Sequence, residues 1–316
     1  MKTLALHDGT AFPAFGLGTW LSEPDAVRKA VRVAIEAGYR HIDAAYIYFN
    51  EEEVGRGIAE AIAAGDVARE DLWVTTKLWN DAHAPDDVQP ALERSLGLLG
   101  LDYVDLYLVH WPVAHQPGVM RPVKREEYAT LQERPLAATW EAMAALPDTG
   151  LARQVGVSNF SASQIGTIVD AVGVTPAVNQ VELHPYLQQD ALLAAMKERG
   201  IVATAYAPLG SSGRPAGMKR KDETSLLGDP VVGAIAQARE CSPAAVLIAW
   251  ALARGTAVIP KSTNPDRIAA NLAATEVVLQ ADDMHALAEL DAGARYVDGT
   301  FWCVGQSPYT LEGLWG

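Results

Sequence analysis

Eight short apolar runs, each followed by a segment with helical periodicity, constrain the fold of this chain more than any other feature. The runs are continuous rather than alternating, which is typical of parallel strands covered on both faces. Eight strand–helix units in 316 residues predict an α/β fold, a closed (β/α)8 TIM barrel, with residues 1–316 as a single domain. The expected strands are residues 15–18, 41–43, 72–76, 104–109, 154–157, 177–181, 201–206 and 257–259.

The N-terminus does not fit this repeat. Residues 3–6 and 10–14 flank His7-Asp8-Gly9, a turn signal that predicts a β-hairpin capping one end of the barrel. A doubly wound sheet is the second candidate fold. It is less favoured because Gly16-x-Gly18 lacks the third glycine of a dinucleotide-binding turn.

Three segments are too long to be ordinary connections: residues 113–135, residues 211–229 and a non-periodic tail, residues 297–316. Two of them follow the ends of strands, on the face where barrel active sites form. We therefore expect long loops at the C-terminal face that wall a pocket and set its specificity.

Composition limits the kind of partner. The chain has 25 Lys and Arg against 39 Asp and Glu, so its formal net charge is −14. Nucleic acids and anionic membranes need basic faces, so neither is expected as a partner. Two cysteines, Cys241 and Cys303, are far apart and form no CxxC, which makes a disulfide framework or a structural zinc site improbable. With no signal peptide evident, we expect a cytoplasmic protein, and a monomer by default.

Four polar residues follow three neighbouring strands, where a barrel brings side chains together at one mouth: Asp43, Tyr48, Lys77 and His110. A buried lysine needs a counter-charge, and Asp43 is the candidate for Lys77. The ammonium should lower the pKa of Tyr48 from about 10, so that the phenol can donate a proton to a carbonyl oxygen. His110 can hydrogen-bond the same oxygen. The four residues therefore suit the reduction of a carbonyl group.

The motifs around these residues resemble the aldo-keto reductase family along the whole chain. They are Gly38-Tyr39-Arg40-His41-Ile42-Asp43 with Tyr48, Thr76-Lys77-Leu78-Trp79-Asn80, Val109-His110-Trp111-Pro112, Gly156-Val157-Ser158-Asn159-Phe160, Asn179-Gln180 with Glu182 and His184-Pro185, Tyr206-Ala207-Pro208-Leu209-Gly210-Ser211, and Ile259-Pro260-Lys261-Ser262. The resemblance implies that the four polar residues are the catalytic tetrad, with Tyr48 as general acid. It also implies a hydride from a nicotinamide that binds extended across the barrel mouth.

The same resemblance assigns the cofactor site. Ser158, Asn159 and Gln180 match residues that hold the carboxamide, and Tyr206 matches the one that stacks on the nicotinamide. Further cofactor positions are Thr19, Trp20, Asp43, Leu209, Ser211, Lys261, Ser262, Thr263, Arg267 and Asn271. Two cations and two hydroxyls at residues 261–267 suit a 2′-phosphate, whereas an NAD site tends to show an acidic residue for the ribose hydroxyl. NADPH, with NADP+ as its oxidised form, is the expected cofactor.

Two positions differ from the better-known members of the family. Ala270 stands where a glutamate often contacts the adenine, and Leu21 where a lysine often approaches the pyrophosphate. These differences bear on how tightly the cofactor binds, not on which cofactor binds. His184 is expected to be structural.

The expected substrate pocket is aromatic, which favours aldehydes and ketones of apolar or aromatic character, with sugar aldehydes as a further possibility. Its residues are Trp20, Phe49, Trp79, His110, Trp111 and Trp302.

Two other functions fit parts of this pattern. A metal-dependent barrel hydrolase would use the histidines near Asp43, but such barrels bring a carboxylate from the last strand, and here that strand leads to Lys261. No metal is therefore expected. A barrel that binds NADPH without catalysis is the other alternative, and the intact tetrad disfavours it.

Overall fold

The computed structural model describes residues 2–221 and 223–316. Eight parallel strands stand side by side in the order β12-β11-β10-β9-β6-β5-β4-β3. The ring closes between the first and last strands: Gly16 N–H donates to Val258 O at 3.0 Å, and Gly18 pairs with Lys261. The barrel strands are β3 (Leu17–Gly18), β4 (His41–Asp43), β5 (Trp73–Leu78), β6 (Val104–Val109), β9 (Ala152–Ser158), β10 (Val178–Glu182), β11 (Val202–Tyr206) and β12 (Ala257–Val258). The predicted (β/α)8 barrel is confirmed, with strand ends shifted by one or two residues.

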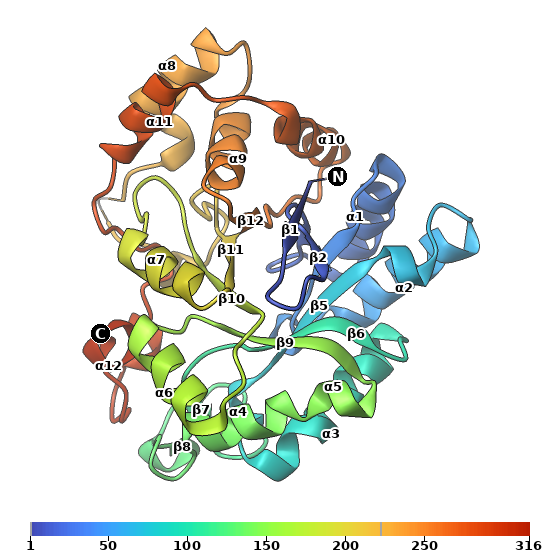
Figure 1. Cartoon of the computed structure of the whole chain (residues 1–316), viewed down its shortest axis with the longest axis vertical. Helices are drawn as coiled ribbons and strands as arrows, with labels where there is room; N and C mark the ends of the chain where they lie inside the picture. The colour runs from blue at the N-terminus through green and yellow to red at the C-terminus, as the bar shows by residue number, and fades with distance from the viewer. Residues whose placement is uncertain (1, 222) are drawn as a thin grey trace.

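Helices surround the strands (Figure 1) and cover the outer face of the barrel, and the strands are buried almost throughout. They are α1 (Pro24–Ala37), α2 (Glu51–Ala63), α3 (Pro85–Leu99), α4 (Leu136–Ala144), α5 (Leu146–Thr149), α6 (Ala162–Val172), α7 (Asp190–Glu198), α8 (Pro230–Ala238), α9 (Pro243–Ala253), α10 (Pro265–Ala273) and α11 (Ala281–Ala288).

Helix α1 shows how the sequence sets these boundaries. Pro24 opens the helix, where its missing N–H costs nothing, and Gly38 ends it at φ 111°, a left-handed conformation that glycine adopts without strain. Val27, Val31 and Ile35 form the buried stripe that faces the strands.

The N-terminal hairpin closes one end of the barrel, as predicted. It consists of β1 (Thr3–Ala5) and β2 (Ala11–Pro13), with Leu4 opposite Phe12. Phe12 is fully buried in an apolar cluster that includes Trp73 and Val178, the first residues of β5 and β10. The hairpin therefore seals the N-terminal ends of the strands and leaves the opposite mouth for chemistry.

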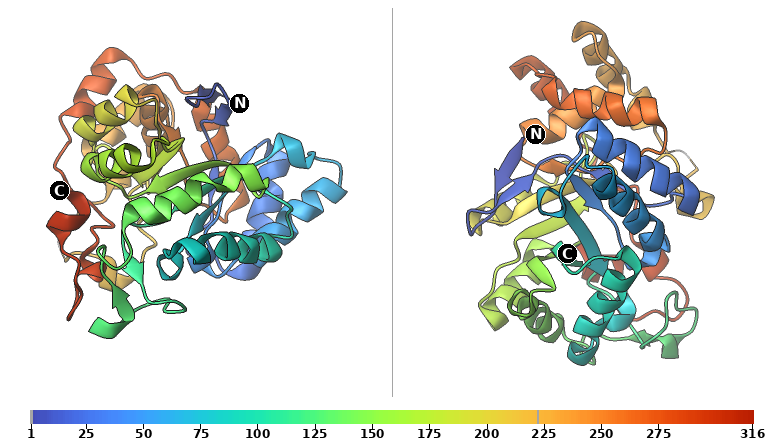
Figure 2. Two further views of the ribbon diagram at one scale, coloured as in Figure 1. Left: turned by 60° about the horizontal axis from the view of Figure 1, so that its bottom comes forward. Right: turned by 90° about the vertical axis from the view of Figure 1, so that its right-hand side faces the viewer.

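Two of the three long segments contain regular elements that were not predicted. The segment after β6 forms a small antiparallel hairpin, β7 (Ala114–His115) and β8 (Tyr128–Ala129), which projects beyond the helices (Figure 2). The tail ends in helix α12 (Leu311–Trp315), so the prediction of a wholly irregular tail is wrong. Both elements are too short to produce a periodic pattern in the sequence.

No single helix among residues 2–221 and 223–316 is long and apolar enough to cross a membrane. Helices α8 and α9 reach the required length and composition only as a pair, and they are bent by 90° at their junction. Residues 245–251 of α9 are buried within the fold.

Candidate active site

The four residues of the expected tetrad meet at the C-terminal mouth of the barrel. Asp43 ends β4, Lys77 lies near the end of β5, and His110 directly follows β6. Tyr48 comes from the 3-10 turn Tyr46–Tyr48, which follows β4 and leads into α2. Strand register aligns these positions, because Asp43 pairs with Thr75 and Lys77 with Leu108.

Lys77 is the centre of the group. Its ammonium donates to Asp43 Oδ1 at 2.6 Å and to Ala44 O at 2.8 Å, and it lies 3.5 Å from the Tyr48 hydroxyl. The other Asp43 oxygen accepts from Gln180 Nε2 at 2.7 Å. Asp43 and Lys77 are each about 1% exposed, so the two side chains form a buried ion pair. The hydrogen bonds described above give the ammonium and both carboxylate oxygens partners within the protein.

The electrostatics of Tyr48 differ from the prediction. Its pKa is raised above 10, first because surrounding protein desolvates the phenol, then because Asp43 and Tyr206 lie nearby. At an effective dielectric of about 20, an ammonium and a phenolate 3.5 Å apart attract by roughly 5 kcal/mol, but Asp43 is nearer to the same ammonium and opposes this effect. The predicted lowering of the Tyr48 pKa is wrong for the protein without cofactor.

Burial also sets the charge of the other two groups. The pKa of His110 falls well below 6.5, because burial and then Lys77 disfavour the imidazolium. The ring is therefore neutral at physiological pH and donates one N–H. Burial lowers the pKa of Lys77 as well, while Asp43 opposes that shift.

The residues expected to hold the nicotinamide form one hydrogen-bonded group beside the tetrad. Ser158 Oγ donates to Gln180 O at 2.8 Å, and Asn159 Nδ2 donates to His110 O at 2.9 Å. The Tyr206 hydroxyl donates to Asn159 Oδ1 at 2.8 Å. Ser158, Asn159 and Gln180 are buried, and Tyr206 is half-buried. Thr19, which directly follows β3, contacts the tetrad: its hydroxyl donates to Asp43 O at 2.8 Å.

The second expected cofactor cluster lies at the start of α10. Asn264 caps this helix by accepting from Arg267 N–H at 2.9 Å, which places Ser262, Thr263 and Arg267 at a helix N-terminus. Helix N-termini favour anions. Lys261 precedes them, exposed, with its ammonium 3.3 Å from Leu21 O. Two cations, two hydroxyls and a helix N-terminus fit a phosphate monoester. Asn271, on the same helix, is buried.

The expected aromatic pocket is partly assembled. Trp302 packs against Trp79 and Trp111, with ring centroids 5.7 Å apart in each pair, and His110 lies 5.2 Å from Trp79. Trp20 lies half-buried after β3, outside this apolar cluster.

Phe49 does not belong to that cluster. It is 61% exposed, because φ is 56° at this residue and the chain turns away into α2. Its ring lies 6.5 Å from Tyr46 instead.

Three further side chains with rings pack against this cluster and were not predicted from the sequence. Trp315 lies 5.9 Å from Trp111, Phe301 lies 5.6 Å from Trp111, and His115 lies 5.3 Å from Trp302. The available signal was the aromatic content of the tail, which has four aromatic residues among residues 301–316.

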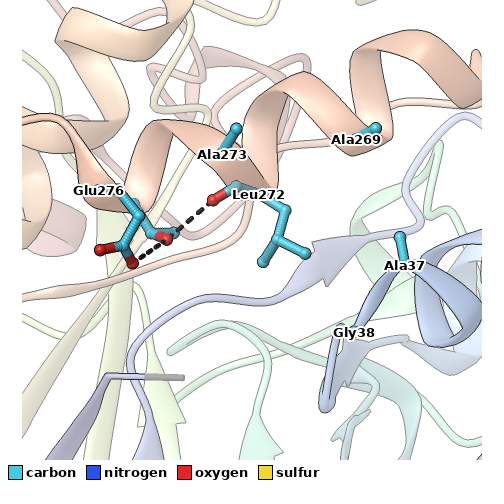
Figure 3. Close-up of a pocket in the computed structure, with 7 residues that line it drawn as sticks. Ala37, Gly38, Ala269, Leu272, Ala273 and Glu276 are labelled. Carbon is cyan, nitrogen blue, oxygen red and sulfur yellow. Dashed lines mark hydrogen bonds between the residues drawn. The ribbon is translucent and has the colours of Figure 1, made fainter.

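A hollow of about 400 Å³ lies elsewhere, between α1 and α10 (Figure 3). It is lined by Ala37, Gly38, Ala269 and Leu272, among others. Gly38 precedes β4, whereas Asp43 ends it, so this hollow opens at the other end of the strands from the tetrad. Its lining residues include none of the tetrad.

Across the described residues, no three His, Cys, Asp or Glu side chains gather closely enough to hold a metal ion. Asp43, the carboxylate at the mouth, is engaged by Lys77 and Gln180.

Comparison with known proteins agrees with the geometry. The model of the Aldo/keto reductase family matches residues 14–292. An aldo/keto reductase of Synechocystis is 49% identical over 315 residues, covering 100% of this chain and 96% of the relative. The aldo-keto reductase family 1 member A1 of Homo sapiens is 44% identical over 295 residues, covering 92% and 90%. The crystal structure of a Bombyx mori aldo-keto reductase in complex with NADP superimposes with a TM-score of 0.87 at 40% identity, covering 96% of each chain. This chain belongs to the aldo/keto reductase family.

Proposed function

We propose that Tyr48, Lys77, Asp43 and His110 carry out the NADPH-dependent reduction of aldehydes and ketones to alcohols. The reaction class follows from the family: the chain is an NADP-dependent oxidoreductase that acts on carbonyl compounds. The observation that supports the four roles is the position of the Lys77 ammonium, 2.6 Å from Asp43 and 3.5 Å from the Tyr48 hydroxyl.

Each residue has a distinct task in this scheme. The raised pKa of Tyr48 keeps the phenol protonated at neutral pH, so the general acid carries its proton before the substrate binds. As the carbonyl oxygen gains electron density it takes this proton, and the Lys77 ammonium stabilises the phenolate left behind. Asp43 keeps Lys77 protonated, and neutral His110 orients the carbonyl oxygen through its N–H. When bound, NADPH supplies the hydride to the carbonyl carbon.

The cofactor residues follow from the same proposal. Gln180, Asn159 and Ser158 would hold the carboxamide by exchanging part of the hydrogen bonds that they now make with one another and with Asp43. Tyr206 stacks on the nicotinamide, and Leu209 and Ser211 cover the pyrophosphate. Lys261, Ser262, Thr263 and Arg267 bind the 2′-phosphate, because an exposed guanidinium on a helix N-terminus suits a dianion.

The substrate is a small carbonyl compound. A wall of Trp79, Trp111 and Trp302 favours apolar or aromatic groups on the carbonyl carbon. We further propose that residues 1–316 form one barrel domain that works as a monomer in the cytoplasm. Two free thiols, Cys241 and Cys303, suit a reducing compartment.

A panel of aldehydes, ketones and keto acids tests this proposal. With NADPH, we expect turnover that is fastest on aromatic aldehydes and that survives exhaustive chelation. Loss of activity on chelation would instead support the metal-dependent alternative. Quenching of tryptophan fluorescence by NADPH, with no turnover on any carbonyl compound, would support a barrel that only binds the cofactor.

A further inference from the structure

Tyr296 links two segments that the proposed function assigns to different ligands. One is the loop of residues 211–229, which contains Ser211 of the expected cofactor cover. The other is the tail, residues 297–316, whose Trp302 walls the substrate pocket. Tyr296 is 4% exposed, and its hydroxyl donates to Thr224 O in the loop at 3.0 Å. Its own backbone leads directly into the tail.

The tail begins on a buried carboxylate. Glu182 ends β10 and is fully buried. One of its oxygens accepts from Tyr296 N–H at 2.6 Å and from His184 Nε2 at 2.8 Å, and the other accepts from Val297 N–H at 2.7 Å. Charge-assisted hydrogen bonds of this kind are short and strong. The start of the tail is therefore fixed to the barrel wall, and His184 takes the structural role expected from the sequence.

The loop, in turn, folds around a buried arginine. Arg214 is 2% exposed and donates to Ser211 O at 3.1 Å and to Met218 O at 3.1 Å, and it forms an ion pair with Glu223. An arginine presents five donors in a rigid fork, so one side chain can hold several loop carbonyls at once.

The loop around Arg214 and the start of the tail at Glu182 both contact Tyr296. The Arg214 guanidinium lies 4.9 Å from the ring centroid, within cation–π range. The ring of His184 packs against the same tyrosine at 4.8 Å. A Cβ on Gly210 would lie 3.4 Å from the Tyr296 ring, so the loop backbone passes close beside it. A displacement of the loop must therefore disturb the tyrosine that starts the tail.

We propose that Tyr296 is a positioning residue that couples the order of the 211–229 loop to the order of the tail. A cofactor held under the loop then also fixes the wall of the substrate pocket. The inference rests on the proposed function in taking the loop as a cofactor contact and Trp302 as part of the pocket wall. Coupling of this kind is a free energy shared between two sites, and it is measured by removing the link.

Hydrogen exchange of the full-length chain, with and without saturating NADPH, tests this inference in the wild type and in three variants. Tyr296→Phe removes only the hydroxyl that reaches Thr224. Tyr296→Leu also removes the ring beneath Arg214. Tyr309→Phe is the matched control, because its hydroxyl binds Ala114 and Ala129 rather than the loop.

In the wild type and in Tyr309→Phe, NADPH should slow exchange in both the loop and the tail. In Tyr296→Leu, NADPH should slow exchange in the loop while protection of the tail falls by about tenfold, which corresponds to ~1.4 kcal/mol of coupling. Tyr296→Phe should lie between the two and keeps the inference testable if the leucine variant folds poorly. At saturating NADPH, both Tyr296 variants should raise KM for the aldehyde more than they lower kcat.

Two outcomes would contradict the coupling, and a third would contradict the proposed cofactor site. Tail protection by NADPH that is equal in wild type and both Tyr296 variants overturns the coupling. Loop protection without any tail response in the wild type overturns it as well. If NADPH slows exchange neither in the loop nor at residues 261–271, the proposed cofactor site itself is wrong, and that failure is distinct from the failure of the coupling.

Discussion

The Lys77 ammonium lies 2.6 Å from the Asp43 carboxylate, and both side chains are sealed from solvent. Burial lowers the pKa of Lys77 below 10.5, and the nearby Asp43 carboxylate opposes part of this shift. In the proposed mechanism, the rate of reduction therefore depends on a lysine whose positive charge Asp43 stabilises, with a smaller contribution from Glu51.

The first prediction concerns the decrease of kcat/KM at alkaline pH. The proposed mechanism requires the Lys77 ammonium, so kcat/KM should fall as pH rises through the Lys77 pKa, with a midpoint below 10.5. In Asp43→Asn the opposing attraction is lost while burial remains, so the midpoint should move to lower pH. Steady-state pH profiles check this. An unmoved limb in folded Asp43→Asn would show that another group controls it. Thermal unfolding is measured alongside, because breaking a buried pair can cost about 3–5 kcal/mol.

The phosphate cluster gives a second prediction. Lys261→Ala and Arg267→Ala each remove a charged donor from the start of α10, which is worth about 1.5–3 kcal/mol in a charge-assisted hydrogen bond. KM for NADPH should therefore rise by about tenfold or more, and KM for NADH should stay within about twofold. NADH is the internal control, since it lacks the 2′-phosphate. Equal effects on the two cofactors would remove these residues from the phosphate site.

The pocket wall gives a third prediction, with a matched control. Trp302→Ala removes a buried indole that contacts Trp79 and Trp111, so KM for aromatic aldehydes should rise by about tenfold, and stability should fall by about 3–5 kcal/mol. Phe49→Ala changes a side chain that is 61% exposed, so both quantities should barely move. A large kinetic effect of Phe49→Ala would return that residue to the pocket.

Acid stability gives a fourth prediction. His83 is fully buried, and burial lowers its pKa to about 3 from 6.5. Between pH 6.5 and about 3, His83 therefore binds a proton in the unfolded chain but not in the folded chain. The free energy of unfolding is unaffected by this residue above pH 6.5, and it decreases as pH falls from 6.5 toward 3. The loss is about 1.4 kcal/mol per pH unit for one such group.

His83→Gln should flatten this loss between pH 6.5 and 4, measured by denaturant unfolding. His285→Gln, on the exposed face of α11, should leave the slope unchanged. Equal slopes in wild type and His83→Gln would mean that His83 does not contribute to acid unfolding.

The barrel and the tetrad could be predicted from the sequence because both depend on local patterns. Continuous apolar runs mark buried parallel strands, and a polar residue at the end of such a run must lie at the mouth. That reasoning predicted the position of Asp43, Lys77 and His110 at the strand ends, where the structure has them, while their catalytic role stays a prediction.

Properties that depend on contacts between residues far apart in the sequence could not be predicted. The pKa of Tyr48 was predicted with the wrong sign, because charged neighbours can be inferred from sequence whereas the desolvation of a phenol cannot. The exposure of Phe49 could not be predicted either, because it depends on how the chain packs around this residue. Trp315 was missed because its contact with Trp111 spans two hundred positions of the chain, and α12 is too short to show periodicity.

The most direct test of the mechanism is turnover of Tyr48→Phe, which removes one hydroxyl and keeps the ring. With NADPH and an aromatic aldehyde, kcat should fall by about 10²–10⁴-fold, the usual contribution of a general acid, while the Kd for NADPH from fluorescence titration stays within about twofold. Wild-type turnover by this variant would contradict the assignment of Tyr48 as the proton donor.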